Sequence, residues 1–212
     1  MMRTKGNETR SNRRKRRNRE ALIDAGYRVM AKKGIDAATM SEIAELADVG
    51  AGTVYNYFAS KQELAMCVVE RAMEHLAERI EAITNSFSDP AQVYAFGIRN
   101  VMKAATTDQR WRWFFRRSEV VAGAMYRVMG PYAIRDIRKA VAAERYQVED
   151  AELAWRLATH AIVGFSMAVC EKNVPAEMMD EVVVNLLGMV GVNRQEAWEL
   201  ARRPCPELPS ES

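Results

Sequence analysis

Two pairs of residues between positions 39 and 64 have the spacing of a capping box, in which a hydroxyl and a carboxylate satisfy the free backbone N–H groups of a helix start. Thr39 precedes Glu42 by three residues, and Ser60 precedes Glu63 by three. Between the pairs, apolar residues recur at helical spacing until the turn sequence Asp-Val-Gly-Ala-Gly interrupts them. The segment therefore predicts a helix from Thr39, a turn, a short helix over residues 51–57 and a third helix from Ser60.

The short helix predicted over residues 51–57 presents a face that suits a nucleic-acid groove. Val54 and Phe58 are expected to pack this helix against its neighbours. The other side chains are small, hydroxylated or amide-bearing, and none is a carboxylate: Ala51, Gly52, Thr53, Tyr55, Asn56 and Tyr57. In a helix-turn-helix the second helix enters the major groove of DNA, and this face is compatible with that role.

This segment resembles the DNA-binding segment of the tetracycline-repressor (TetR) family. The resemblance rests on twelve positions at fixed spacing: Thr39, Ile43, Ala44, Ala47, Val49, Gly52, Thr53, Tyr55, Tyr57, Phe58, Lys61 and Leu64. The sequence departs from the family pattern at Asp48, where glycine is common, and at Gly50, where serine or threonine is common. The second departure leaves the short helix without a side-chain N-cap.

The resemblance implies two kinds of DNA contact. Phosphate contacts are implied for Thr39, Tyr55, Tyr57 and Lys61, and base contacts for Ala51, Gly52 and Thr53. Lys61 lies in the first turn of its helix, where a positive charge adds to backbone donors that favour an anion. The alternatives are that Thr39 only caps its helix and that the two tyrosines are packing residues. The methyl of Ala51 and the hydroxyl of Thr53 can distinguish few base pairs, so the operator sequence cannot be predicted from these residues.

Positive charge is concentrated at the beginning of the chain. Nine basic residues against one acidic residue give residues 1–19 a net charge of +8, although the whole chain carries only +3. We expect residues 1–18 to form a disordered basic arm that neutralises DNA phosphates, and a solvated tail without a partner is the alternative. The arm lacks the apolar run of a secretory signal, so we expect a cytoplasmic protein.

Helical periodicity covers the rest of the chain, and strand-like alternation is absent. We expect a first helix that ends at Gly34, a long helix from Ser60 to about Ser86, and a helix that begins at Asp89-Pro90. Further helical tracts are expected over 111–121, 131–144, 149–172 and 176–202. The predicted fold is all-α: an N-terminal three-helix helix-turn-helix DNA-binding domain over 19–63, a C-terminal helical ligand-binding and dimerisation domain over 64–203, and a disordered tail over 204–212.

Small and apolar residues on the last two long helices predict a two-fold dimer. The candidate interface residues are Leu157, Ala161, Gly164, Phe165, Val183, Leu186, Leu187 and Val190. In the family such a helix pair builds a four-helix interface, which presents two DNA-reading heads at successive major grooves of a palindromic site. An intramolecular pair of helices is the alternative.

Aromatic and methionine residues in the middle of the chain are candidate walls of a cavity for a small, largely apolar ligand. They are Trp111, Phe114, Phe115, Met125, Tyr126, Met129, Trp155, His160 and Phe165. A filled core without a cavity is the alternative, because apolar residues at helical spacing are usually core residues. His160 is expected to be a hydrogen-bonded core histidine. Since His75 is the only other histidine, no metal site and no cofactor are predicted.

The sequence also excludes several classes of protein. No nucleophile elbow, P-loop, dinucleotide fingerprint or H-E-x-x-H motif is present, so an enzyme is not predicted. No apolar run approaches the roughly 20 residues that cross a bilayer. The resemblance implies a homodimeric transcriptional regulator, typically a repressor released from a palindromic operator when a small molecule tilts the long helix from Ser60. A ligand-independent dimeric DNA-binding protein is the alternative.

Overall fold

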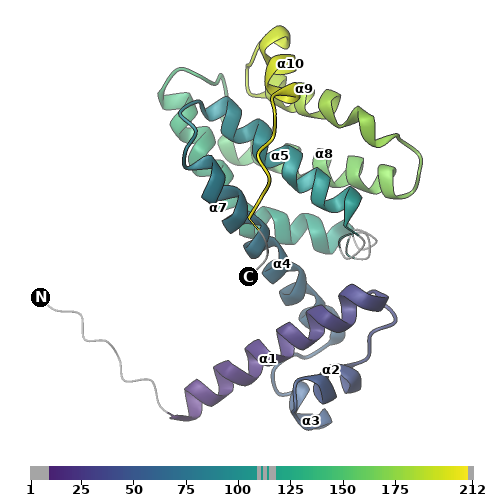
Figure 1. Cartoon of the computed structure of the whole chain (residues 1–212). Helices are drawn as coiled ribbons and strands as arrows, with labels where there is room; N and C mark the ends of the chain where they lie inside the picture. The colour runs from purple at the N-terminus through teal and green to yellow at the C-terminus, as the bar shows by residue number, and fades with distance from the viewer. Residues whose placement is uncertain (1–9, 109–110, 112–113, 115–117, 210–212) are drawn as a thin grey trace, which may run out of the picture. The chain divides into compact units, whose positions relative to one another are not determined.

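The structure, a computed structural model, describes residues 10–108, 111, 114 and 118–209. All regular secondary structure in these residues is helical (Figure 1), which confirms the predicted fold class. The chain divides into two compact units, Met1–Val68 and Val69–Ser212, and each is described on its own. The division falls within one helix and lies a few residues after the predicted boundary at 63.

The first unit holds the helices of the predicted helix-turn-helix. It consists of α1 (Arg10–Lys33), α2 (Met40–Leu46), α3 (Ala51–Val54) and the first turns of α4 (Lys61–Thr84). α1 stops as predicted, because Gly34 adopts a positive φ of 88° and its N–H donates to the carbonyl of Met30 at 2.8 Å. The core of the unit is formed by fully buried apolar side chains: Leu22, Met30, Ile43, Val54, Phe58, Leu64 and Val68.

The beginning of α1 differs from the prediction. Residues 10–18, expected to be a disordered arm, form the first turns of the helix. Arginine and lysine are good helix formers, and each added residue extends a helix already anchored by the buried Leu22. Arg19 belongs to the unit itself, because its guanidinium donates to Cys67 Sγ at 3.2 Å and lies 5.3 Å from the ring centroid of Phe58.

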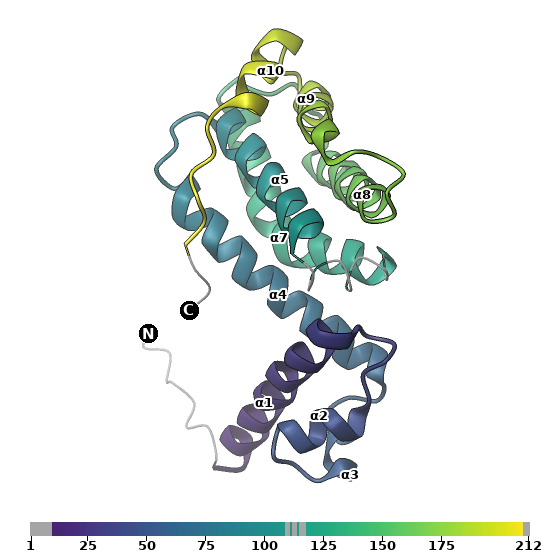
Figure 2. The same cartoon turned by 45° about the vertical axis from the view of Figure 1, so that its right-hand side comes forward.

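The second unit is a bundle around α5. It contains the rest of α4, α5 (Pro90–Thr107), α7 (Ser118–Ala142), α8 (Ala151–Cys170), the 3₁₀ turn η1 (Ala176–Met178), α9 (Met179–Met189) and α10 (Arg194–Arg202). α5 packs against α7, α8, α9 and α10, and Figures 1 and 2 show it between them. The predicted start of α5 is confirmed, since Asp89 Oδ1 accepts the N–H of Ala91 at 3.0 Å and proline follows at the first helical position.

Two helix boundaries in this unit were predicted wrongly. The break expected at Gly130-Pro131 is absent, and Pro131 lies inside α7. Proline removes one helical hydrogen bond, but Met125, Met129 and Ile137 on the same helix are buried and hold it in place. The single helix expected over 176–202 is divided, because Gly191 has a φ of 94° and Asn193 Oδ1 accepts the N–H of Glu196 at 3.0 Å to start α10.

The segment after α10 is also ordered where disorder was expected. Residues 204–209 run in an extended conformation along α5 towards α4, and the segment is yellow in Figure 1. The side-chain amide of Asn100 donates to Cys205 Sγ at 3.4 Å, and Arg79 Nε donates to the carbonyl of Pro209 at 2.5 Å. These contacts place the tail of the described chain on the second unit.

Candidate functional site

The predicted capping box at Thr39 is complete in the first unit, whereas the one at Ser60 is half formed, because the Glu63 carboxylate accepts the N–H of Ala59 in place of that of Ser60. Thr39 Oγ1 accepts the N–H of Glu42 at 3.3 Å, and the Glu42 carboxylate accepts the N–H of Thr39 at 3.1 Å. Lys33, at the end of α1, also donates to Glu42. The hydrogen bonds from Lys33 and then from Thr39 lower the pKa of Glu42 to about 2. At α4, Ser60 Oγ accepts the N–H of Glu63 at 3.1 Å.

α3 is a single helical turn that packs on the unit through one face and is exposed on the other. Val54 and Phe58 are buried, whereas Tyr55 is 60% exposed. A Cβ added to Gly52 would meet nothing within 4 Å, so the backbone there is open to close approach. Gly50 is the N-cap and makes no side-chain hydrogen bond, as its residue type predicted. The helix is shorter than expected, because residues 55–57 form a turn.

The turn between α2 and α3 explains one departure from the family pattern. Asp48 has a φ of 54°, in the left-handed region that glycine adopts without steric cost. Glycine, which is common in the family at this position, matches that backbone. Aspartate is among the few other residue types that occupy this region with any frequency. The turn therefore forms with Asp48 in a strained but accessible conformation.

Lys61 contacts the protein's own backbone. Its ammonium donates to the carbonyl of Asp36 at 2.7 Å and to that of Ala38 at 3.1 Å. Both carbonyls lie in the loop that leads to Thr39. An ammonium has three N–H groups, so these two contacts leave one for another acceptor. Lys61 thus ties the start of α4 to the loop before α2.

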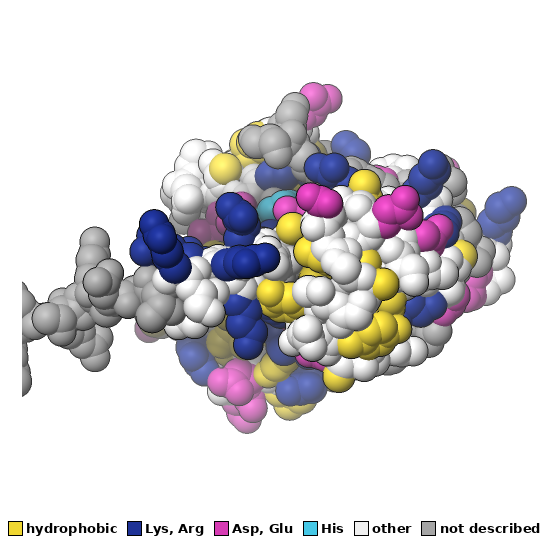
Figure 3. Space-filling model, turned by 90° about the horizontal axis from the view of Figure 1, so that it is seen from below, with side chains coloured by type: hydrophobic (Ala, Val, Ile, Leu, Met, Phe, Trp, Pro, Cys, Tyr) yellow, Lys and Arg dark blue, Asp and Glu magenta, His cyan; other side chains and the backbone are white. Residues whose placement is uncertain are grey.

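The seven residues predicted to contact DNA all lie in the first unit. Four are exposed and three are half-buried: Thr39, Ala51, Gly52 and Tyr55 in the first group, and Thr53, Tyr57 and Lys61 in the second. In the same unit, the start of α1 is strongly basic. Arg10, Arg13, Arg14, Lys15 and Arg17 are exposed, and Figure 3 shows dark-blue side chains gathered where the chain leaves the grey residues. Six cations of residues 10–17 have no acidic residue among them.

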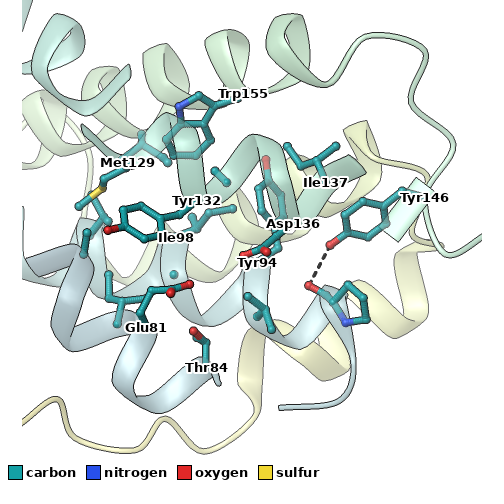
Figure 4. A pocket seen from close by; sticks show the side chains of 18 residues that line it. Glu81, Thr84, Tyr94, Ile98, Met129, Tyr132, Asp136, Ile137, Tyr146 and Trp155 are labelled. Atoms are coloured by element: carbon teal, nitrogen blue, oxygen red, sulfur yellow. Dashed lines mark hydrogen bonds between the residues drawn. The ribbon is translucent and has the colours of Figure 1, made fainter. Parts of the chain in front are cut away.

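The second unit contains a partly open cavity of about 90 Å³, drawn in Figure 4. Its wall is contributed by α4, α5, α7 and α8 and by Tyr146 in the loop after α7. Most of the lining is apolar, including Ile98, Met129, Trp155 and Ile162. The space inside this cavity can hold one small molecule.

A few polar groups interrupt the apolar wall. Glu81 on α4 and Asp136 on α7 both line the cavity, and Arg135 bridges them. The guanidinium donates to Glu81 Oε1 at 2.6 Å and to Asp136 Oδ1 at 2.7 Å. These bonds raise the pKa of Arg135 above its usual value, the bond to Asp136 contributing most. Burial raises the pKa of Tyr94 and of Tyr146 above the usual value for a phenol.

Among the predicted pocket residues that the structure describes, two line this cavity, Met129 and Trp155. Trp111, Phe114 and Met125 are buried elsewhere in the second unit. Tyr126 lies under the guanidinium of Arg156, 4.1 Å from it. The remaining three residues are placed as follows: Phe165 is half-buried outside the cavity lining, His160 is exposed and Phe115 lies outside the described residues.

His160 therefore does not occupy the core position expected of it. Its Nδ1 contacts the carbonyl of Arg156 at 2.8 Å, one turn back along α8, but the ring is exposed. The reason is that α8 buries one face only. Its length and composition alone suffice for a membrane span, yet Trp155, Ala158 and Ile162 are buried within the second unit, as in a core helix.

The opposite face of α8 carries half of the predicted dimer residues. Leu157 is 51% exposed, Ala161 and Gly164 are also exposed, and Phe165 is half-buried. The four candidates on and after α9, namely Val183, Leu186, Leu187 and Val190, are at most 2% exposed. Those four pack within their own chain in place of the interface predicted for them. Two large apolar residues outside the predicted set are also exposed on these helices, Leu153 and Met189.

Comparison with known proteins agrees with both units. Residues 22–66 match the bacterial regulatory proteins of the tetR family, and residues 89–203 match the tetracyclin repressor-like C-terminal domain. The regulator BetI of Rhizobium meliloti is 32% identical over 110 residues, which are 49% of this chain and 54% of BetI. The repressor KstR of Mycolicibacterium smegmatis is 31% identical over 99 residues, 47% of this chain and 46% of KstR. The chain thus spans about half the length of these curated relatives.

A solved structure matches over a longer range. RolR in complex with its ligand resorcinol is 30% identical, with a TM-score of 0.86, and the match covers 94% of this chain and 100% of RolR. RolR without ligand gives a TM-score of 0.81 at the same identity. The C-terminal domain match alone covers more than half of the chain. The chain belongs to the TetR family of bacterial transcriptional regulators, which are DNA-binding proteins and not enzymes.

Proposed function

We propose that the protein is a homodimeric repressor that binds a palindromic operator through α3 and leaves it when a small molecule fills the cavity of the second unit. The observation that carries the DNA-binding part is the exposed α3, presented after a capped α2 inside the segment that matches the family's DNA-binding domain. In this proposal the protein acts in the cytoplasm.

The DNA contacts proposed here divide into two groups. Tyr55 presents an exposed side chain to phosphates, and the third N–H of Lys61 is left for the same strand. Thr39 is also exposed, but its hydroxyl donates to Glu42 Oε2 at 2.7 Å and would have to exchange that bond for one to a phosphate. Ala51, Gly52 and Thr53 face base edges, where the open backbone at Gly52 permits close approach. The cations at the start of α1 add affinity that is independent of sequence and falls with salt.

Dimerisation through α8 and α9 would supply the second DNA-reading head. Leu153, Leu157 and Met189 are large exposed apolar side chains, and such side chains are usually covered by a partner when they gather on neighbouring helices. A Cβ added to Gly164 or Gly188 would meet nothing within 4 Å, so a helix of a second copy can approach closely at both. A two-fold pair of heads matches a palindromic site.

The cavity is the proposed effector site, because α4 reaches it. Ile80, Glu81 and Thr84 of α4 line the cavity, while Lys61 begins the same helix in the first unit. A ligand that binds one position of α4 better than another shifts the population towards that position. The solved relative at 30% identity was crystallised with resorcinol, which supports a small ring compound as the first effector to try.

The test is operator binding measured by fluorescence anisotropy on duplexes from the region upstream of the gene, with and without resorcinol. We expect the anisotropy of the duplex to rise at low salt, two protein chains to bind each operator, and binding to weaken when resorcinol is added. Failure to bind any duplex would remove the whole proposal. Binding that no small molecule alters would leave the alternative, a ligand-independent dimeric DNA-binding protein.

A further inference from the structure

We propose that the cavity of the second unit takes a compact, uncharged ring that carries hydroxyl groups on two of its edges, with Tyr94 and Glu81 as the residues that select them. The inference rests on the proposed function only in naming this cavity as the effector site. Figure 4 shows Tyr94, Glu81 and Trp155 around the same space.

Tyr94 provides the first selecting group. The residue is 9% exposed and lines the cavity, and among the described residues its hydroxyl has no hydrogen-bond partner. The hydroxyl keeps some accessible surface, and a ligand group that reaches it can form a hydrogen bond in largely apolar surroundings. Tyr146, in the same wall, is the contrasting case, because its hydroxyl donates to the carbonyl of Pro90 at 3.1 Å. Tyr94 is therefore free to bind a ligand where Tyr146 is not.

Glu81 provides the second selecting group. Arg135 donates to Glu81 Oε1 at 2.6 Å, whereas Oε2 receives no hydrogen bond from a described residue. Both oxygens of Asp136 are occupied by Arg135, at 2.7 and 3.0 Å. An ionised carboxylate only accepts hydrogen bonds, so a ligand must present a donor to Glu81. A hydroxyl supplies that donor without a charge of its own.

The rest of the cavity decides the shape and charge of the ligand. An engineered apolar cavity of about 150 Å³ binds benzene, and this cavity has about 90 Å³, so a single ring is the upper size. Ile98, Met129 and Trp155 offer apolar contact to the faces of a ring. Two carboxylates beside one guanidinium leave an excess of negative charge in the wall, which disfavours an anion. Ligands that carry a carboxylate are thereby disfavoured.

The ligand class is tested on the full-length protein by calorimetric titration and thermal shift, without DNA. The probes are benzene, phenol, the three benzenediols and benzoate. We expect binding to strengthen from benzene to phenol to at least one benzenediol, and no binding of benzoate. Equal affinity for benzene and phenol, binding of benzoate, or no binding by any probe would each overturn the inference. In the last case, intact operator binding would show that the DNA function stands without this ligand class.

Two tyrosine variants separate a selecting hydroxyl from a structural one. Tyr94→Phe should weaken phenol binding by about tenfold and leave benzene binding unchanged, and the unliganded protein should unfold at the same or a higher temperature. Tyr146→Phe, the matched control, should keep the wild-type ratio of phenol to benzene affinity. Glu81→Gln should reduce the preference for benzenediol over phenol. If Tyr94→Phe and Tyr146→Phe leave the same phenol-to-benzene ratio, Tyr94 is not a selecting residue.

Discussion

The ammonium of Lys61, at the start of α4, donates to the carbonyl of Asp36 at 2.7 Å in the loop before α2. A second bond to the carbonyl of Ala38 completes a tie between these segments. Lys61→Ala should therefore lower the stability of the first unit by about 1 kcal/mol, since a hydrogen bond from a charged donor is lost at a partly exposed site. Urea unfolding followed by circular dichroism measures this change.

The same variant also tests the phosphate contact proposed for Lys61. If its remaining N–H reaches a phosphate, Lys61→Ala weakens binding to every duplex and makes the dependence of affinity on salt less steep. Lys32→Ala is the matched control, because it removes an exposed cation near the end of α1. A loss of stability with an unchanged salt dependence would assign Lys61 to structure alone.

Acid should weaken the first unit through Glu42. Its folded-state pKa lies near 2, below the ordinary glutamate value of 4.5, so the unfolded chain binds the proton more readily. The stabilisation is therefore complete above about pH 5 and is lost as the pH falls towards 2. Urea midpoints at pH 7 and pH 3 measure the loss. Glu42→Gln should reduce the difference between the two midpoints, and a difference equal to that of the wild type would contradict the assignment.

The turn before α3 offers a stabilising substitution. Asp48 has a φ of 54°, and glycine adopts this region without the clash of a Cβ. Asp48→Gly should raise the free energy of unfolding by up to about 1 kcal/mol, offset in part by the greater freedom of glycine in the unfolded chain. Asp48→Ala should lower it. Thermal unfolding of the two variants checks the opposite signs, and a destabilised Asp48→Gly would count against the strain.

The part of the site that sequence predicts well is the part built from neighbours in the chain. Thr39 with Glu42 and Ser60 with Glu63 lie three residues apart, so their capping bonds follow from residue type and helix geometry alone. The exposure of Tyr55 follows similarly, because Val54 beside it is the apolar residue that must be buried.

The cavity could not be predicted from neighbouring residues in the sequence. Tyr94 and Glu81 come from different helices, and their approach depends on how α4 and α5 pack. The aromatic residues around Trp111 led to the prediction of a ligand cavity there, but Trp111 is buried outside the cavity that the structure shows. One feature of the sequence does point to the cavity. Glu81 is a carboxylate directly beside the apolar residues Ile80 and Ile83 of the same helix. Pro131 inside α7 shows the same limit, since tertiary packing overrides a local helix breaker.

The dimer proposal predicts the effect of a charge on the outer face of α8. Leu157 is 51% exposed there, and Leu157→Glu would place carboxylates of both copies in an apolar interface. We expect a monomer in sedimentation equilibrium at micromolar concentration and operator affinity at least tenfold weaker, because one head replaces two. Lys103→Glu, an exposed charge change on α5, should leave the protein dimeric. A dimeric Leu157→Glu protein would place the interface elsewhere.

Thr53 and Tyr55 should affect DNA binding in different ways. Tyr55 is 60% exposed, and a phosphate contact from its hydroxyl adds affinity without reading sequence. Tyr55→Phe should therefore weaken binding to all duplexes by a similar factor. Thr53 faces base edges in the proposal, so Thr53→Ala should change the order of affinities among operator variants, by about 1 kcal/mol for the base pair it contacts. Anisotropy across a set of single-base operator variants measures both. If Thr53→Ala weakened binding to all operator variants equally, the Thr53 hydroxyl would contact a phosphate and not a base.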